Sequence, residues 1–292
     1  MNITMVIGDR KFLNNDVLLI NLYLRGTTSM ALLRIGDLQL YYEIHGNGDP
    51  LLLIAGLASD SQSWQPIIGE LSRHFRVIVF DNRGVGRTSP SEVNTSITLM
   101  ADDCIALINH LGLTTVSILG HSMGGFIAMD FAIRFPHCVE KLILAATSAL
   151  TSHRNKALLS DWVSYQESGM DLELWFRNIF YWIFSRDFFE NEETLNEAIR
   201  LAIAYPYPQS RVAFRKQVQA IAEFDRLKDL CNITSKTLVI SGKEDLLFPP
   251  EEAILLSKKI PGSRFSLIEK AAHSIHIEYP ETIIEIILNF MG

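Results

Sequence analysis

Short apolar runs alternate with longer segments of mixed polarity through most of this chain. Six Val/Ile/Leu-rich runs carry the pattern from residue 50 onward: Leu51–Ile54, Arg76–Phe80, Val116–Leu119, Lys141–Leu144, Thr237–Ser241 and Arg264–Ile268. Short, mostly apolar runs between turn-forming residues are typical of strands buried on both faces. Because segments of helical length separate them, the sequence predicts an α/β fold with a mainly parallel central sheet and flanking helices.

Two connecting segments carry helix-end signals, and a hairpin precedes them. Thr95–Leu111 is followed by Gly112, a common residue just past a helix end, and Gly125–Phe135 stops before Pro136. Upstream, Ala31–His45 contains two strand-like runs around a Gly-Asp turn. We therefore expect an antiparallel hairpin ahead of the parallel strands.

The alternation stops between about residues 151 and 224, which predicts an inserted helical cap on a core formed by residues 30–150 and 225–292. Four candidate helical pieces lie in the cap: Asp161–Tyr165, Asp171–Ile183, Glu190–Ala204 and Ser210–Ile221. Ten aromatic residues fall between Trp162 and Phe189. They either pack the cap helices together or line an apolar substrate pocket.

Residues 1–29 differ from the rest and are interpreted as an N-terminal extension outside the fold, with Met30 as a candidate start. Their longest apolar run, Val17–Leu24, contains Asn21 and is far shorter than the ~20 residues that span a bilayer. Asp9 and Asp16 stand where a secretory leader would be basic. We expect neither a membrane span nor a secretion signal.

Composition narrows the class of protein. With 292 residues, 48% hydrophobic and 20% charged, the chain can bury the core of one or two globular domains. A net charge of −7 disfavours a nucleic-acid binder, which usually presents a basic surface. Cys104, Cys138 and Cys231 form no Cys-x-x-Cys pair, so we interpret them as buried thiols in a reducing compartment and expect a cytoplasmic protein.

The strongest chemical signal is Gly120-His121-Ser122-Met123-Gly124, placed between a predicted strand and a predicted helix. A nucleophilic serine on so sharp a turn needs glycine two residues before and two residues after it, because side chains there would collide. The following helix also directs its N-terminal amides toward the site where an oxyanion forms. Ser122 is therefore the predicted nucleophile.

A serine nucleophile needs a base, and the base needs an acid that orients it. Asp245 follows the predicted strand Thr237–Ser241, and His273 follows the next strand. The chain order Ser122, Asp245, His273 is that of the Gly-x-Ser-x-Gly hydrolases. Glu244 and His276 are the neighbouring rivals for the acid and the base. Three other acids are interpreted as surface residues: Asp102, Asp103 and Asp225.

An oxyanion hole in such a site uses backbone amides only. The amide after the nucleophile belongs to Met123. The second comes from the loop after an early strand, here Ile54–Ala58, where Gly56 lets the backbone turn and Leu57 supplies the amide. The side chains of Leu57 and Met123 remain free to form pocket wall.

With these motifs in place, the chain from Met30 onward resembles the α/β-hydrolase fold superfamily, in its cap-bearing group of carboxylesterases, enol-lactonases and carbon-carbon bond hydrolases. The segment Asp81-Asn-Arg-Gly-Val-Gly-Arg-Thr-Ser89 is similar to the family's Asp-x-Arg-Gly-x-Gly-x-Ser loop, with Thr88 where serine is usual. Ala55 stands where the family often has histidine. Ser122 separates the chain from haloalkane dehalogenases, which use aspartate there.

The resemblance implies a serine hydrolase that cleaves a carboxylic ester or related acyl compound. The aromatic residues of the predicted cap suggest a small-to-medium, partly apolar acyl or alcohol group. An enol-lactonase or carbon-carbon hydrolase is the alternative on the same scaffold; it would need a cation for the substrate carboxylate, with Arg177 and Arg186 as candidates. A non-catalytic ligand-binding member of the fold is the alternative from another class. Because the remaining histidines are scattered, we expect no metal and no cofactor. The oligomeric state stays open.

Overall fold

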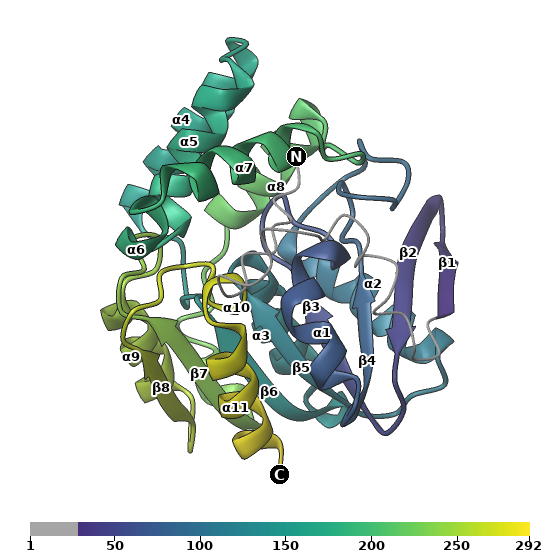
Figure 1. The fold of residues 1–292 in the computed structure, drawn as a ribbon. Coiled ribbons are helices and arrows are strands. Elements are labelled where there is room, and N and C mark those ends of the chain that lie inside the picture. Colours follow the sequence, from purple (N-terminus) through teal and green to yellow (C-terminus); the bar gives the residue numbers. More distant parts are fainter. Residues whose placement is uncertain (1–28) are drawn as a thin grey trace.

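The computed structural model describes residues 29–292, so the predicted extension lies outside the described residues except for Ser29, which begins the first strand. Figure 1 shows a central sheet with helices on both faces and further helices above one end. The strands are β1 (Ser29–Ile35), β2 (Leu38–His45), β3 (Asp49–Ile54), β4 (Phe75–Phe80), β5 (Val116–His121), β6 (Val139–Ala145), β7 (Lys236–Gly242) and β8 (Arg264–Ile268). All six predicted parallel strands and the predicted hairpin are present.

The eight strands form one sheet in the order β1-β2-β4-β3-β5-β6-β7-β8. β1 pairs antiparallel with β2, and β2 pairs antiparallel with β4. Every later pairing, from β4·β3 to β7·β8, is parallel. The predicted α/β fold class is confirmed. Because the strands from β3 to β8 run the same way, the loops after their carboxyl ends gather at one edge of the sheet.

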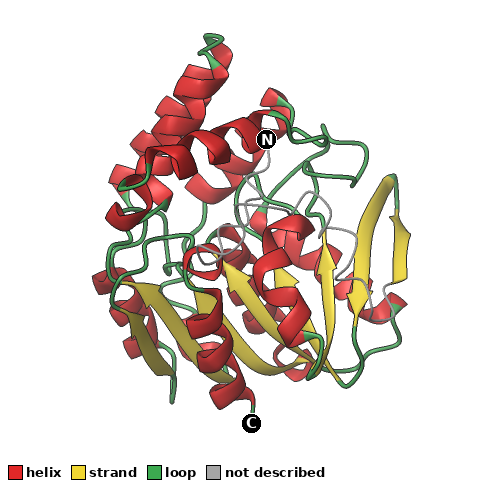
Figure 2. Ribbon diagram, viewed as in Figure 1, coloured by secondary structure: helices red, strands yellow, loops and turns green. Residues whose placement is uncertain are grey.

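Helices cover both faces of this sheet and its carboxyl edge (Figure 2). The helices are α1 (Gln65–Leu71), α2 (Ile97–His110), α3 (Met123–Arg134), α4 (His153–Glu167), α5 (Leu172–Ile183), α6 (Arg186–Phe189), α7 (Glu192–Ile203), α8 (Arg211–Ala222), α9 (Pro250–Lys259), α10 (Ile275–Glu278) and α11 (Pro280–Met291). Short 3₁₀ turns lie at Ser61–Trp64, Pro136–Cys138 and Leu230–Asn232. Within residues 29–292, no helix combines the length and the hydropathy that crossing a bilayer requires.

The core consists of two apolar layers, one on each face of the sheet. Along β3, Leu51 and Leu53 belong to the layer that includes α1 and α11, whereas Leu52 and Ile54 belong to the layer that includes α2 and α3. Successive side chains of a strand point to opposite faces, so a strand covered on both sides is apolar throughout. Burying each such leucine stabilises the fold by about 1.5–3 kcal/mol.

Helices α4–α8 form one continuous stretch between β6 and β7, which we call the helical segment (residues 151–224). In Figure 1 it lies above the carboxyl edge of the sheet. α4 is much longer than the predicted piece Asp161–Tyr165, because Ser152 caps it by accepting a hydrogen bond from the Asn155 amide. Its exposed face is polar, so hydrophobic spacing did not reveal its first two turns.

Candidate active site

The turn between β5 and α3 places Ser122 at the carboxyl edge of the sheet. Ser122 has φ 56° and ψ −121°, a conformation that costs a non-glycine residue free energy. A Cβ atom on Gly120 would lie 2.3 Å from the Gly124 carbonyl oxygen, and one on Gly124 would lie 1.9 Å from the Ile54 carbonyl oxygen. The backbones therefore approach as closely as the Gly-x-Ser-x-Gly pattern predicts.

The structure brings Ser122, His273 and Asp245 together from three separate loops. His273 Nε2 lies 3.0 Å from Ser122 Oγ, and His273 Nδ1 lies 3.0 Å from Asp245 Oδ2. All three residues are buried. Because the Asp245 carboxylate accepts from Nδ1–H, Nε2 is left with the lone pair that can take a proton from Ser122 Oγ.

Asp245 is fixed from both sides, unlike its rival Glu244. The Leu247 and Phe248 amides donate to Asp245 Oδ1 at 2.8 and 2.9 Å, so Oδ2 is the oxygen that faces His273. Glu244 turns away and accepts a hydrogen bond from the Arg186 amide at 3.0 Å. Of the two neighbouring acids, Asp245 alone contacts the histidine.

Two further imidazoles, from His121 and His276, pack behind His273. His121 Nε2 lies 2.8 Å from the His273 carbonyl oxygen, and since a carbonyl only accepts, this nitrogen carries the proton. The His276 ring lies 4.5 Å from the His121 ring and 4.7 Å from the Trp64 indole. The histidine that contacts Ser122 Oγ is His273 and not its rival His276. Burial lowers the pKa of His276 to about 3 and holds that of His121 well below its usual value, with nearby imidazoles adding to both shifts. Both rings are therefore neutral at pH 7.

The loop after β3 lies against Ser122, as the predicted oxyanion hole requires. A Cβ atom on Gly56 would lie 3.1 Å from Ser122 Cβ. Asn82 Nδ2 donates to the Ala55 carbonyl oxygen at 3.1 Å, and the Ala58 amide donates to Gln217 Oε1 of α8 at 3.3 Å. Leu57 therefore sits in a loop held at both ends. Met123 is the first residue of α3, where helix amides lack partners within the helix.

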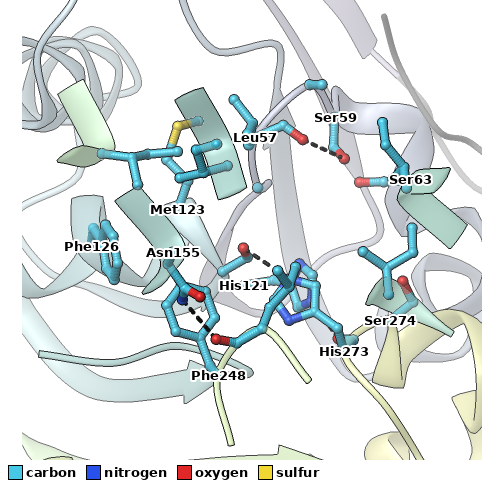
Figure 3. Close-up of a pocket in the computed structure, with 18 of the residues that line it drawn as sticks. Leu57, Ser59, Ser63, His121, Met123, Phe126, Asn155, Phe248, His273 and Ser274 are labelled. Carbon is cyan, nitrogen blue, oxygen red and sulfur yellow. Dashed lines mark hydrogen bonds between the residues drawn. The ribbon is translucent and has the colours of Figure 1, made fainter. Parts of the chain in front are cut away.

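A pocket opens beside Ser122 between the sheet edge and the helical segment (Figure 3). Its cavity volume is about 90 Å³. The rest of the wall comes from the end of β5, the loops after the strands, the 3₁₀ turn Ser61–Trp64, α3 and α10, which contribute Gly56, Leu57, Ala58, Ser59, Ser63, His121, Ser122, Met123, Phe126, Leu247, Phe248, His273, Ser274, His276 and Ile277. The helical segment contributes Asn155, Leu159, Trp162, Ile179, Ile183, Phe214 and Ile221. The wall is mostly apolar.

The aromatic cluster of the helical segment serves mainly as packing. Of its ten rings, Trp162 lines the pocket beside Ser122. Others stack on one another, such as Phe184 on Phe188 with ring centroids 4.2 Å apart. No pattern in the sequence points to Asn155, which reaches the pocket because α4 begins earlier than predicted.

Neither arginine proposed for a substrate carboxylate lines this pocket. Arg177 Nε donates to Glu173 at 3.2 Å on the outside of α5, and Arg186 lies beside Glu244 in a separate shallow hollow. The residues that line the pocket include no lysine and no arginine. The cation that a carboxylate-bearing substrate would need is absent from this part of the described chain.

Three readings of the sequence need correction or qualification. Asp103 is not a surface residue: it is buried and forms a two-pronged ion pair with Arg83, at 2.6 and 2.7 Å, beneath the Asp81–Ser89 loop. Cys104 is buried, as expected, but Cys138 is half-buried and Cys231 is exposed, because the latter two lie on short 3₁₀ turns at the surface. Thr88 replaces the usual serine without loss, since its hydroxyl donates to the Asp81 carbonyl oxygen at 2.6 Å.

Comparisons with known proteins show which proteins this chain and its fold are similar to. The chain is 30% identical to "Putative carbamate hydrolase RutD" of Agrobacterium fabrum strain C58, over 86% of this chain and 98% of that protein. It is similar to the structure of a thermophilic esterase from Thermogutta terrifontis, with 27% identity, a TM-score of 0.79, and coverage of 90% of this chain and 97% of that one. The structure of "Putative non-heme bromoperoxidase BpoC" from Mycobacterium tuberculosis H37Rv also has 27% identity and a TM-score of 0.79, covering 86% of this chain and 95% of that one. The profile of the alpha/beta hydrolase fold family matches residues 49–280, and the chain belongs to this family.

Proposed function

We propose that this protein is a serine hydrolase that cleaves a carboxylic ester or related acyl compound through an acyl-enzyme intermediate. The observation that carries the proposal is the chain of two 3.0 Å contacts from Ser122 through His273 to Asp245. A protein that only binds a ligand has no use for a buried serine, base and acid aligned in this order.

The proposed reaction has two steps, formation of the acyl-enzyme and its hydrolysis, and His273 transfers a proton in both. Ser122 Oγ attacks the substrate carbonyl carbon while its proton passes to His273 Nε2, and Asp245 stabilises the resulting imidazolium. The amides of Leu57 and Met123 stabilise the oxyanion. The alcohol leaves with the proton from His273. A water molecule then attacks the acyl carbon and gives a proton to His273, and the acid is released as the bond to Ser122 Oγ breaks and His273 returns this proton to Oγ.

The pocket favours a small, uncharged acyl group. An apolar cavity of 150 Å³ holds benzene, so a volume of about 90 Å³ suits an acyl chain of a few carbons. Enol-lactones and carbon-carbon hydrolase substrates of the alternative reading carry carboxylates, and the pocket offers no cation to pair with them. The names of two relatives, a carbamate hydrolase and an esterase, both indicate attack on an acyl carbon.

The helical segment acts in this proposal as a cap, since it supplies one side of the pocket wall and separates Ser122 from bulk water. We further propose a cytoplasmic location, on the ground that all three cysteines are free thiols.

The test compares wild type with Ser122→Ala on p-nitrophenyl esters of increasing acyl length. We expect wild type to prefer short chains, and the variant to lose at least about a thousandfold in kcat while it stays folded, because alanine removes only the oxygen. Ser117→Ala, which removes another buried serine of β5, is the matched control and keeps its activity.

Labelling by a fluorophosphonate probe gives a second readout that does not depend on the substrate chosen. Wild type and Ser117→Ala should be labelled, and Ser122→Ala should not. If the Ser122→Ala variant were labelled as strongly as wild type, or turned over the ester as fast, Ser122 would not be the nucleophile. A folded wild type that neither reacts with the probe nor cleaves any ester would favour a ligand-binding protein.

A further inference from the structure

The pocket wall contains a buried side-chain oxygen that has no partner within residues 29–292. Asn155, in the first turn of α4, is 2% exposed and lines the pocket. Its Oδ1 atom is buried and accepts no hydrogen bond from any other group within residues 29–292. Buried polar side-chain atoms are nearly always hydrogen-bonded in native proteins, so an unmatched acceptor beside a reactive serine calls for an explanation.

The orientation of the Asn155 amide is fixed by its other end. Asn155 Nδ2 donates to the Leu247 carbonyl oxygen at 2.7 Å, the contact drawn as a dashed line beside Phe248 in Figure 3. Because a carbonyl oxygen only accepts, the nitrogen of the side-chain amide must face Leu247. Oδ1 is therefore the atom left over, and its position does not depend on an arbitrary choice between the two ends of the amide.

The remaining wall around this acceptor is poor in hydrogen-bond donors. Within the helical segment, the other residues that line the pocket are Leu159, Trp162, Ile179, Ile183, Phe214 and Ile221. The Trp162 indole N–H is already used, since it donates to Asn178 Oδ1 at 2.9 Å. No group within residues 29–292 donates to Asn155 Oδ1, so this oxygen is free to accept from a molecule that enters the pocket.

We propose that Asn155 is a specificity-determining residue whose Oδ1 accepts a hydrogen bond from an O–H or N–H group on the acyl part of the substrate. The inference rests on the proposed function and narrows its substrate class, from any small uncharged acyl group to one that carries a donor within a few atoms of the carbonyl. The acyl side is assigned because the acyl group stays bound on Ser122 after the alcohol has left, and so it suits the enclosed part of the pocket.

The proposed role of Asn155 makes the site selective for acyl groups that carry a hydrogen-bond donor. An acyl group that ends in a methyl leaves Asn155 Oδ1 without a partner, whereas an isosteric group with a hydroxyl or N–H supplies one. Sites built to bond a substrate O–H or N–H discriminate strongly against the analogue that lacks it, because their own polar groups are then left unpaired.

Three p-nitrophenyl substrates of nearly equal size test the inference. The propionate has no donor, the glycolate replaces its terminal methyl with a hydroxyl, and the N-methylcarbamate replaces its methylene with an N–H. Release of p-nitrophenolate gives the second-order rate constant for acylation of each, after subtraction of the rate without enzyme. Wild type and Asn155→Leu are compared, since leucine keeps the volume and removes the acceptor.

We expect Asn155→Leu to lower the rate constant for at least one donor-bearing substrate about tenfold more than that for the propionate. The substrate affected shows whether the donor is a hydroxyl or an N–H. Loss of the Asn155–Leu247 bond also disturbs the loop that holds Asp245, but that damage lowers all three rate constants by a common factor and cancels in the ratio.

Ratios to the propionate that stay within twofold of wild type for both donor-bearing substrates would overturn the inference. If Asn155→Leu fails to fold, Asn155→Ser is measured in the same way. Wild type alone then gives a second test, because its preference over the propionate, with each rate constant divided by the rate with hydroxide, should exceed about tenfold for at least one of the two donor-bearing substrates. Failure of the proposed function is distinct: it appears as turnover of all three esters by Ser122→Ala.

Discussion

Replacing Asp245 by asparagine tests the proposed mechanism at a point where the structure dictates the outcome. The two Asp245 oxygens have different partners: Oδ1 accepts from the Leu247 and Phe248 amides, and Oδ2 accepts from His273 Nδ1. An asparagine must keep its oxygen where the two amides donate, because an NH₂ group there would face two other donors. Its NH₂ group then faces His273.

That orientation reverses the tautomer of His273. Nδ1 becomes the acceptor, so the imidazole proton moves to Nε2, the nitrogen 3.0 Å from Ser122 Oγ. Nε2 can no longer take the serine proton. We expect kcat to fall by about 10³–10⁴, which corresponds to about 4–5.5 kcal/mol of transition-state stabilisation. KM should change little, because Asp245 does not line the pocket.

The assay is steady-state hydrolysis of the best p-nitrophenyl ester, with urea unfolding to show that the variant is folded. Since asparagine keeps the two bonds at Oδ1, the free energy of unfolding should change by only about 1 kcal/mol. Glu244→Gln is the matched control, because Glu244 is the adjacent acid and contacts the Arg186 amide instead. An Asp245→Asn variant that retains more than a tenth of wild-type kcat would refute the reasoning. A Glu244→Gln variant whose kcat falls as far as that of Asp245→Asn would refute it too.

Two further predictions concern stability. Gly124→Ala should lower the free energy of unfolding by about 3 kcal/mol or more, because its Cβ would lie 1.9 Å from the Ile54 carbonyl oxygen. Gly169 has a φ of 76° but no atom within 4 Å of the position that a Cβ would take, so Gly169→Ala should lose only about 1–2 kcal/mol. Both values come from the same urea titration. Equal losses would contradict the close approach. Burial lowers the pKa of His276 to about 3. Below about pH 6.5 the unfolded chain therefore binds a proton at this residue that the folded chain does not. The free energy of unfolding decreases as the pH is lowered, by about 2 kcal/mol at pH 5. Between pH 7.5 and 5, His276→Gln should therefore lose about 2 kcal/mol less than wild type, and an unchanged slope would show that His276 is not buried neutral.

Local patterns in the sequence were enough to predict most of the fold. The runs in β3 and β4 are apolar at successive positions because both faces of the sheet are covered, so their composition alone distinguishes them from half-exposed strands. The two glycines around Ser122 are required by contacts with nearby backbone, and that requirement is written into the motif itself. These features depend on neighbours close in the chain or on the type of residue.

The sequence did not predict features that depend on partners distant in the chain. The helical position of Asp103 predicts a surface acid, yet Arg83 from another loop pairs with its carboxylate, which is buried. The residue type of Cys231 predicts a buried thiol, but its 3₁₀ turn leaves it exposed at the surface.

The sequence by itself determined the sheet, the strained turn at Ser122 and the order in which serine, acid and histidine follow the strands. The tertiary structure decided the rest: that Asp245 rather than Glu244 meets His273, that the candidate arginines stay outside the pocket, and that Asn155 faces it with an unmatched oxygen. The physical reason is that strand type and turn strain arise from local sterics and burial patterns, whereas the lining of a pocket is set by how α4 and α5 pack over loops nearly a hundred residues away.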